Sequence, residues 1–304
     1  MNNSIKIIFC SVLVIIAFGT CRQQQASQVK GNDTFVKGKA LFLADESFKP
    51  ILDQEAYVFK AAFTEAKPEL IYKSENEVLK LFLEDSIRVA ILSRELNPAE
   101  LQVLKNRGLP PDVNRFAIDA IALIVNEQSA DTTLSVNQIK DMLNGRIMTD
   151  KNIVFDNPNS SLVRYLKEFS GNKDLKQKNI YALQSNKDVI KYVSEHPQSI
   201  GIVGFSWLDD PDKDYADAVQ KVKIVGVKNE SNDKAPTEYF KPNQTTLALK
   251  QYPLIRGLYI LNSTGKIGLA AGFAAFMKSD RGQRIILKSG LLPDSIPQRE
   301  MILK

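Results

Sequence analysis

Hydrophobic positions along the chain follow two alternating spacings. Apolar residues that recur every three or four positions predict amphipathic helices, and short unbroken apolar runs predict buried strands. Helices are predicted at 56–66, 78–83, 98–107, 135–144, 160–169, 187–195, 267–277 and 281–289. Strands are predicted at 41–43, 69–72, 87–92, 114–125, 152–155, 180–183 and 200–205. This alternation of strands and helices favours an α/β fold with largely parallel sheets and helices on both faces.

The first twenty residues have a different pattern. A short start with one cation, Lys6, leads into the apolar run 7–18, and a polar run follows from Arg22. The run is shorter than the ~20 apolar residues that a spanning helix needs. Residues 1–20 are therefore predicted to be a signal peptide, and we leave them out of the fold.

Cys21 ends this segment, and residues 18–21 look like a bacterial lipoprotein processing site, although Phe18 and Thr20 depart from the usual pattern. Cleavage before Cys21 would expose its thiol for lipidation, with residues 21–35 as the lipidated N-terminus and flexible tether. This predicts a protein of the periplasm or cell surface, held to a bacterial membrane by its lipid. Ordinary secretion with a free Cys21 is the alternative.

Composition narrows the remaining possibilities. The second cysteine, Cys10, lies in the segment predicted to be removed, so the mature chain has no disulfide partner and depends on its hydrophobic core. About 280 mature residues are enough for two domains. The net charge of +5, with both signs interspersed, argues against a nucleic-acid partner.

Four turns between a predicted strand and helix carry a serine. Ligands of open α/β sheets bind at the carboxyl ends of the strands, where free N–H groups begin the helices. Hydroxyl and N–H groups can donate to a tetrahedral oxyanion, and Arg94 or Arg164 could neutralise its charge. The four serines are Ser47, Ser74, Ser93 and Ser160.

Each feature also has a purely structural interpretation. Any of the serines can cap a helix, and Ser74 followed by Glu77 predicts a capping box. Arg94 and Arg164, each taken alone, can be solvated surface charges. Because an anion often binds where a helix is capped, the occurrence of four such turns favours an anion site.

At this point the chain resembles a known family, the phosphate-binding proteins of bacterial ABC phosphate transporters and their lipoprotein relatives. The resemblance runs from about Phe42 to Arg299 and depends on the order and spacing of several motifs. These are residues 90–96 with the Ser-Arg-x-Leu turn, 114–126, 199–204, 252–256, and 279–283 followed by Gly290.

The resemblance implies a two-lobed fold of the type II periplasmic-binding-protein class. Each lobe would be a mixed, mostly parallel sheet flanked by helices, with two crossing strands near 116–123 and 251–259 as the hinge. Lobe 1 would contain residues 36–118 and 256–304, and lobe 2 residues 119–255.

The resemblance also implies a function and a site. We expect a monomer that binds inorganic phosphate or a similar small oxyanion in the interlobe cleft and delivers it to an ABC transporter permease, without metal or cofactor. The family's anion-binding turns match Ser47 with the Phe48 amide, Ser74, Ser93 and Ser160. Arg94, Ser161 and Arg164 complete the expected ligand-binding set.

The sequence departs from the family pattern in two ways. The family's Ser-Gly-Thr signature appears here as Ser160-Ser161-Leu162, and Asp156 stands near a position where many relatives carry an arginine. Asp45 and Glu46 add further negative charge beside the first turn. These departures change the hydroxyl groups and the charge of the expected anion site.

Two other functions are alternatives. A hydrolase would need a nucleophile and a base, but the only histidine, His196, precedes a proline at a predicted helix end, and residues 204–208 lack the final glycine of a nucleophile elbow. We therefore expect no enzyme activity. A phosphate-sensing or assembly lipoprotein with the same fold and no transporter is the second alternative.

Overall fold

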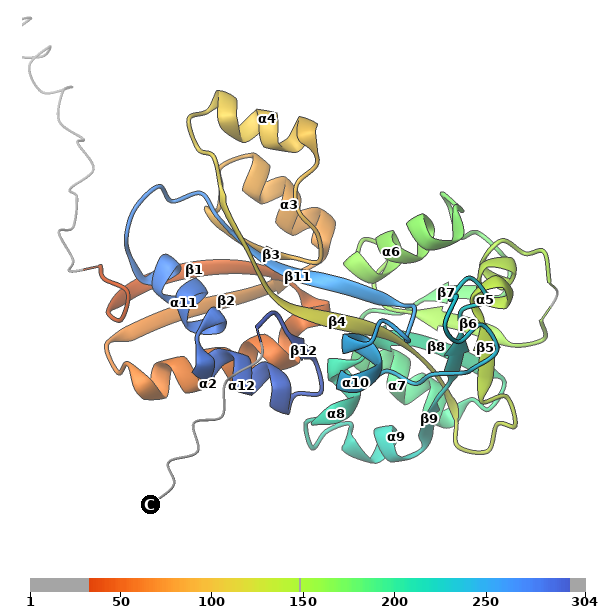
Figure 1. The fold of residues 1–304 in the computed structure, drawn as a ribbon. Helices are drawn as coiled ribbons and strands as arrows, with labels where there is room; N and C mark the ends of the chain where they lie inside the picture. The colour runs from red at the N-terminus through yellow and green to blue at the C-terminus, as the bar shows by residue number, and fades with distance from the viewer. Residues whose placement is uncertain (1–32, 148, 296–304) are drawn as a thin grey trace, which may run out of the picture. The chain divides into compact units, whose positions relative to one another are not determined.

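The computed structural model describes residues 33–147 and 149–295 (Figure 1). The predicted signal peptide, Cys21 and most of the predicted tether lie outside these residues. Among the helices that are described, none is long and apolar enough to span a membrane.

The first group of strands combines both ends of the described chain. Three parallel strands from the N-terminal part are ordered β2-β1-β3, and the antiparallel strand β11 joins them to β4. The strands are β1 (Gly38–Asp45), β2 (Ala66–Lys73), β3 (Val89–Leu92), β4 (Asp112–Asn126), β11 (Ile255–Asn262) and β12 (Leu292–Pro293), which pairs with β4. Their helices are η1 (Glu46–Phe48), α2 (Lys49–Ala62), α3 (Glu75–Leu83), α4 (Pro98–Asn106), α11 (Leu269–Lys278) and α12 (Asp280–Lys288).

The second group of strands comes from the middle of the chain. Its order is β4-β8-β6-β7, with β6 parallel to both of its neighbours and β8 antiparallel to β4. The strands are β6 (Asn152–Phe155), β7 (Ile180–Ala182), β8 (Ser199–Gly204), β9 (Val222–Ile224), and a separate pair of β5 (Thr133–Ser135) and β10 (Gly226–Lys228). The helices are α5 (Val136–Leu143), α6 (Ser161–Ser170), α7 (Asn186–Glu195), α8 (Ser206–Asp209), α9 (Ala216–Gln220) and α10 (Gln244–Ala248).

Strand β4 belongs to both groups. Its residues up to Ala120 pair with β11, and from Ile121 onward they pair with β8. The chain returns beside it, because the Ile121 N–H donates to the Leu254 carbonyl at 2.9 Å. Residues 116–125 are almost continuously apolar and nearly all buried, which is the pattern of a strand covered on both faces.

Phenylalanine side chains link the N-terminal and C-terminal parts of the first group. Phe59 of α2 lies edge-on to Phe273 and Phe276 of α11, with ring centroids 5.2 and 5.1 Å apart. Phe42 of β1 contacts Phe273 in the same geometry. Such edge-to-face pairs each contribute about 0.5–1.5 kcal/mol beyond the area that they bury. These contacts hold the N-terminal and C-terminal parts of the first group together.

Most predicted elements occur where the sequence predicts them, but the predicted helix at 56–66 is wrong at its end. Helix α2 ends at Ala62, and Ala66 already begins β2, where it pairs with Gly38 of β1. The Ala66 N–H donates to the Phe63 carbonyl at 2.9 Å, which closes a tight turn. The helical spacing of small apolar residues continued by chance into the strand.

Candidate ligand-binding site

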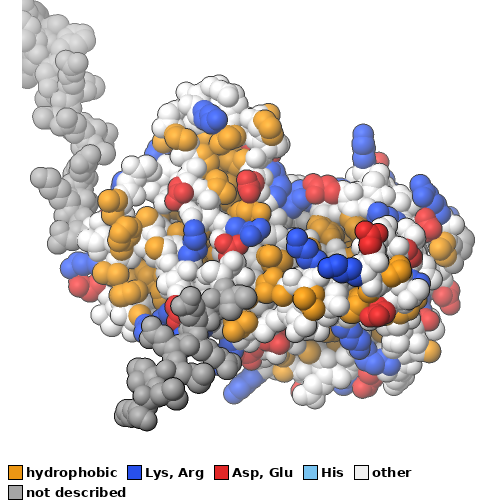
Figure 2. Space-filling view, viewed as in Figure 1, with side chains coloured by type: hydrophobic (Ala, Val, Ile, Leu, Met, Phe, Trp, Pro, Cys, Tyr) orange, Lys and Arg blue, Asp and Glu red, His pale blue; other side chains and the backbone are white. Residues whose placement is uncertain are grey.

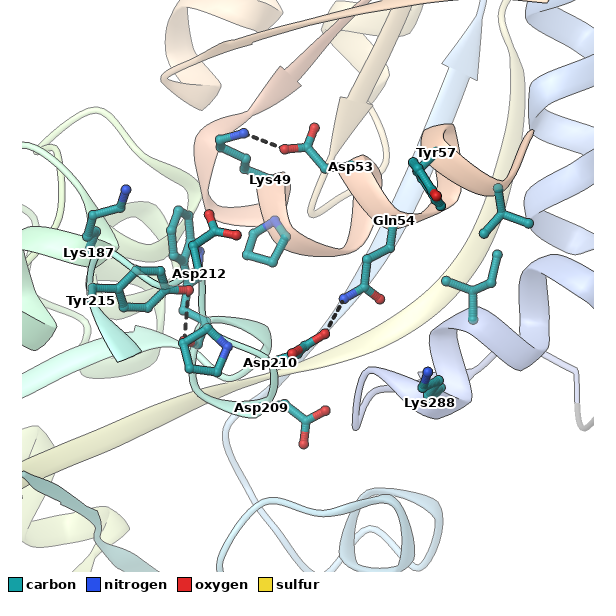
Figure 3. Close-up of a pocket in the computed structure, with 15 residues that line it drawn as sticks. Lys49, Asp53, Gln54, Tyr57, Lys187, Asp209, Asp210, Asp212, Tyr215 and Lys288 are labelled. Atoms are coloured by element: carbon teal, nitrogen blue, oxygen red, sulfur yellow. Dashed lines mark hydrogen bonds and ion pairs between the residues drawn. The ribbon is translucent and has the colours of Figure 1, made fainter. Parts of the chain in front are cut away.

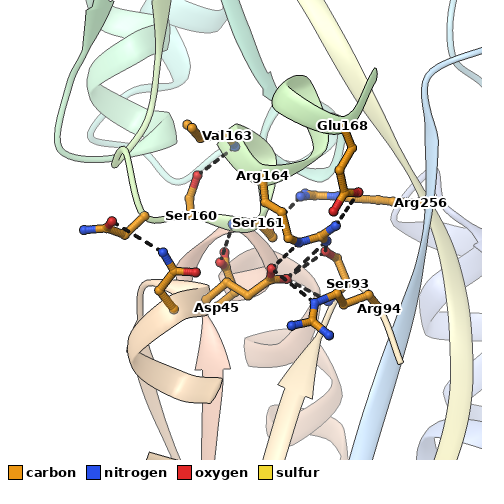
Figure 4. Close-up of polar contacts among 12 residues, drawn as sticks. Asp45, Ser93, Arg94, Ser160, Ser161, Val163, Arg164, Glu168 and Arg256 are labelled. Atoms are coloured by element: carbon orange, nitrogen blue, oxygen red, sulfur yellow. Dashed lines mark hydrogen bonds and ion pairs between the residues drawn. The ribbon is translucent and has the colours of Figure 1, made fainter. Parts of the chain in front are cut away.

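Four of the predicted serines lie where the two strand groups face each other. Figure 4 labels Ser93, Ser160 and Ser161 at this interface. Ser47 lies in η1 after β1, and Ser93 directly follows β3. Ser160 and Ser161 stand at the start of α6, which follows β6. All four are buried. The carboxyl ends of strands from both groups therefore present hydroxyl and N–H donors to a shared interface.

Two buried carboxylates accept most of the bonds from these serines. The Ser47 hydroxyl donates to Asp156 at 3.2 Å, and the Ser160 hydroxyl donates to the other oxygen of Asp156 at 2.5 Å. The backbone N–H groups of Ser47 and Ser161 donate to Asp45 at 2.8 and 2.9 Å. Asp45 and Asp156 thus cross-link the turns of the two groups.

A third buried carboxylate, Glu75, occupies the other end of the interface. The Ser93 hydroxyl donates to it at 2.9 Å, and the Arg164 guanidinium forms an ion pair with it. Arg164 also donates to the Ser93 hydroxyl at 2.6 Å and to Glu168 on the solvent side at 2.8 Å. Arg164 therefore leaves the apolar stripe of α6 and reaches back to the interface, as its position in the helix predicts.

Arg256 is the functional candidate that the sequence analysis did not assign. It lies in β11, donates to the Ser161 hydroxyl at 2.8 Å, and donates twice to Asp119 of β4 at 2.9 and 2.8 Å. Its guanidinium also lies 4.9 Å from the centre of the Phe48 ring. The sequence did contain a signal for this ion pair: one arginine and one aspartate stand in two otherwise apolar strands. Buried charges are rare unless they are paired, so the two residues could have been expected to pair.

Two predicted ligand residues have other contacts. Arg94 makes a two-bond ion pair with Glu100 at 2.7 and 2.8 Å, and its Nε lies 4.0 Å from Glu75. Ser74 precedes α3, but the predicted capping box is wrong, since its side chain makes no capping bond. Glu77 pairs instead with Lys73 four residues earlier, which removes its carboxylate from the helix start.

The acidic groups of the interface are difficult to ionise together. Burial, followed by the charge of Asp45, raises the pKa of Asp156 to about 7. Burial and the charge of Asp156 raise the pKa of Glu46 to about 8, and burial and the charge of Glu75 also raise the pKa of Asp45. Asp156 and Glu46 therefore take up protons near neutral pH, because each further negative charge in a low-dielectric region is unfavourable.

A groove of about 910 Å³ lies beside this interface (Figure 3). It is lined by α2 and α12 on one side and by the α7 start and the segment 207–215 on the other. Trp207 connects it to the site, since its indole N–H donates to the Ser47 carbonyl at 3.0 Å. In the described residues, no three His, Cys, Asp or Glu side chains are placed to hold a metal ion.

Two strand groups that share β4 define a two-lobed α/β fold, and a comparison with family models identifies the family. Residues 31–281 match the model of the PBP superfamily domain. The match covers most of the chain, which therefore belongs to the PBP superfamily. A search of curated proteins found no match.

Solved structures with the same fold include several described as phosphate-binding. A phosphate ABC transporter substrate-binding protein from Clostridium perfringens, solved with bound phosphate, has 20% identity and a TM-score of 0.71, and the match covers 85% of this chain and 100% of that one. An ABC-type phosphate transport receptor from Vibrio cholerae has 18% identity and a TM-score of 0.63, with 84% and 100% covered. A protein from Planctomyces limnophilus has 17% identity and a TM-score of 0.58, with 85% and 93% covered.

The family match and the solved structures confirm the predicted type II periplasmic-binding-protein fold. The only histidine, His196, is an exposed residue that follows α7 and stacks on the Tyr192 ring. On the face shown in Figure 2, basic and acidic side chains are interspersed. At these identities the solved structures define the fold alone.

Proposed function

We propose that this protein is an extracytoplasmic solute-binding lipoprotein that binds phosphate, or a similar small oxyanion, between its two lobes and delivers it to an ABC transporter. One observation carries the proposal: the serine donors and Arg164 from two strand groups converge on carboxylate oxygens. Carboxylate and phosphate oxygens accept the same charge-assisted hydrogen bonds. Donors arranged for one therefore suit the other.

The proposed lobes contain residues 36–118 with 256–304, and residues 119–255. The change of partner along β4 at Ala120 and Ile121 supports this division. An anion held by Ser47 and Ser93 from one lobe and by Ser161 and Arg164 from the other favours the closed form by its differential affinity. Closure is then the signal that a permease reads.

Arg164→Ala is expected to weaken phosphate binding about 10- to 150-fold, because a hydrogen bond to a charged group contributes about 1.5–3 kcal/mol. Calorimetric titration with phosphate, sulfate and arsenate measures the loss and ranks the three anions. Lys105→Ala is the control, since Lys105 is exposed on α4. Equal phosphate affinity in wild type and Arg164→Ala would show that Arg164 does not bind the ligand.

The proposed lipid anchor is tested at Cys21. Cys21→Ser is expected to move the protein from the membrane fraction to the soluble fraction, because a serine hydroxyl cannot take the thioether-linked lipid. Cys10→Ser is the matched control, and it should leave fractionation unchanged because Cys10 lies in the segment predicted to be removed. Membrane association that persists in Cys21→Ser would contradict lipidation at this residue.

A second candidate function is a sensing or assembly lipoprotein that works without a transporter. The buried carboxylates favour it, because Asp45, Glu75 and Asp156 already accept bonds from the donors that a free anion would use. The titration separates an assembly role from the two roles that need a ligand: saturable binding of an oxyanion supports transport or sensing of that anion, and binding of none of the three supports an assembly role.

A further inference from the structure

Glu75 links donors that come from opposite sides of the site. It is the first residue of α3, its side chain is 1% exposed, and it contacts Ser93 of its own strand group. Arg164, from α6 of the other group, donates to both Glu75 and Ser93. These three side chains form one closed set of contacts. Figure 4 shows Arg164 pointing toward Ser93.

The two oxygens of Glu75 accept hydrogen bonds from a hydroxyl and a guanidinium. A bound phosphate would accept hydrogen bonds from the same two groups. We propose that Glu75 is a tethered competitor of the ligand: an external oxyanion binds as the Glu75 carboxylate leaves Ser93 and Arg164. This inference rests on the proposed function. Binding is then an exchange of one anion for another at the same donors.

Glu75 is better placed for this exchange than the other two buried acids. Asp45 and Asp156 accept from serine hydroxyls and from amide and backbone N–H groups. Glu75 is the one of the three with a direct bond to a guanidinium in the described structure. Arg164 is also the accessible partner, with 22% of its side chain exposed. An incoming anion therefore reaches Arg164 first and can replace Glu75 as the ion-pair partner of Arg164.

A tethered group competes strongly because it never diffuses away. Its effective concentration at the donors is in the millimolar range or above, as for other short intramolecular links. The apparent affinity for an external ligand equals the intrinsic affinity multiplied by the fraction of molecules in which the donors are free. Glu75 thus sets how much free anion is needed to occupy the site.

Glu75→Gln tests the competition while keeping the size of the side chain. The neutral amide forms no ion pair with Arg164, so inorganic phosphate is expected to bind at least tenfold more tightly than to wild type in calorimetric titration. Glu168→Gln is the matched control, because Glu168 also pairs with Arg164 but is 63% exposed and is not bonded to Ser93. It removes the same charge from the solvent side and is expected to change the affinity less than threefold.

The fluorescence of Trp207 provides a second measurement of the same exchange. It is the only tryptophan, is 2% exposed, and bonds to the Ser47 carbonyl across the interface. Without added anion, Glu75→Gln is expected to show red-shifted tryptophan emission relative to wild type, and phosphate should reverse the shift. Thermal unfolding followed by circular dichroism checks that the variant is folded.

The outcomes separate the inference from the proposed function. Tighter phosphate binding in Glu75→Gln and unchanged binding in Glu168→Gln support the inference. Equal or weaker binding in Glu75→Gln, with wild type binding phosphate, overturns it and leaves the proposed function standing. An equal gain in both variants also overturns it, since that result requires only a general charge effect. If neither wild type nor Glu75→Gln binds phosphate, sulfate or arsenate, the proposed function itself fails.

Discussion

Replacing Arg256 with methionine is expected to lower the free energy of unfolding by about 3–5 kcal/mol, the range for removing one partner of a buried ion pair. Arg256 and Asp119 are 5% and 1% exposed, and methionine would leave the Asp119 carboxylate buried without its cation. The Ser161 hydroxyl and the Phe48 ring would lose a partner as well. Urea denaturation at constant pH measures the effect.

An exposed ion pair gives the control for this loss. Arg115 pairs with Asp294 at 2.5 Å, but the arginine side chain is 46% exposed. Arg115→Met should therefore lower the free energy of unfolding by less than about 1 kcal/mol. A similar small loss in Arg256→Met would mean that the crossing strands do not depend on the buried pair.

The order of the helices and strands could be predicted from the sequence, because the spacing of apolar residues in each element reflects which of its faces is buried. Helix α5 was predicted at 135–144 and occupies Val136–Leu143, where Ser135 and Gln138 form a capping box. Strand β6 was predicted at 152–155 and occupies those residues. The error at Ala66 occurred where a strand of alternating burial followed a helix with small apolar residues.

The serine turns of the site were also predictable, because a strand that leads into a helix fixes where its turn lies. The structure brings Ser47, Ser93, Ser160 and Ser161 together at one interface. Ser74 shows the limit of a local motif: the sequence pattern of a capping box was present, but an ion pair to the preceding strand holds the glutamate elsewhere. A motif states which bonds are possible, and neighbouring charges decide which bonds form.

The partners of the donors could not be predicted. Glu75 accepts from Ser93, 18 residues later, and from Arg164, 89 residues later. The sequence marked Asp45 as added negative charge and Asp156 as a departure from the family pattern, but nothing in it indicated that these acids and Glu75 are buried while Glu168 is exposed. Which carboxylate reaches a given donor depends on how the two strand groups meet. That is a property of tertiary packing.

Glu55→Leu is expected to stabilise the protein by about 2–3 kcal/mol at pH 7 and to remove part of its pH dependence. Glu55 lies on the buried face of α2, is 0% exposed, and neither carboxylate oxygen has a hydrogen-bond partner within the described residues. Burial raises its pKa from 4.5 to about 9, so the folded protein keeps this carboxyl protonated at pH 7. The unfolded chain releases that proton.

The sign of the pH effect follows from this difference. Between about pH 4.5 and 9 the folded state binds more protons at Glu55 than the unfolded state, so its contribution to stability falls as pH rises. Urea denaturation at pH 5, 7 and 9 should therefore show the advantage of Glu55→Leu over wild type increasing at each step. Glu84→Gln, at an exposed position that ends α3, should show a constant difference from wild type over the same range. An advantage of Glu55→Leu that is the same at all three values would mean that Glu55 is ionised in the folded protein, with a partner that compensates its burial.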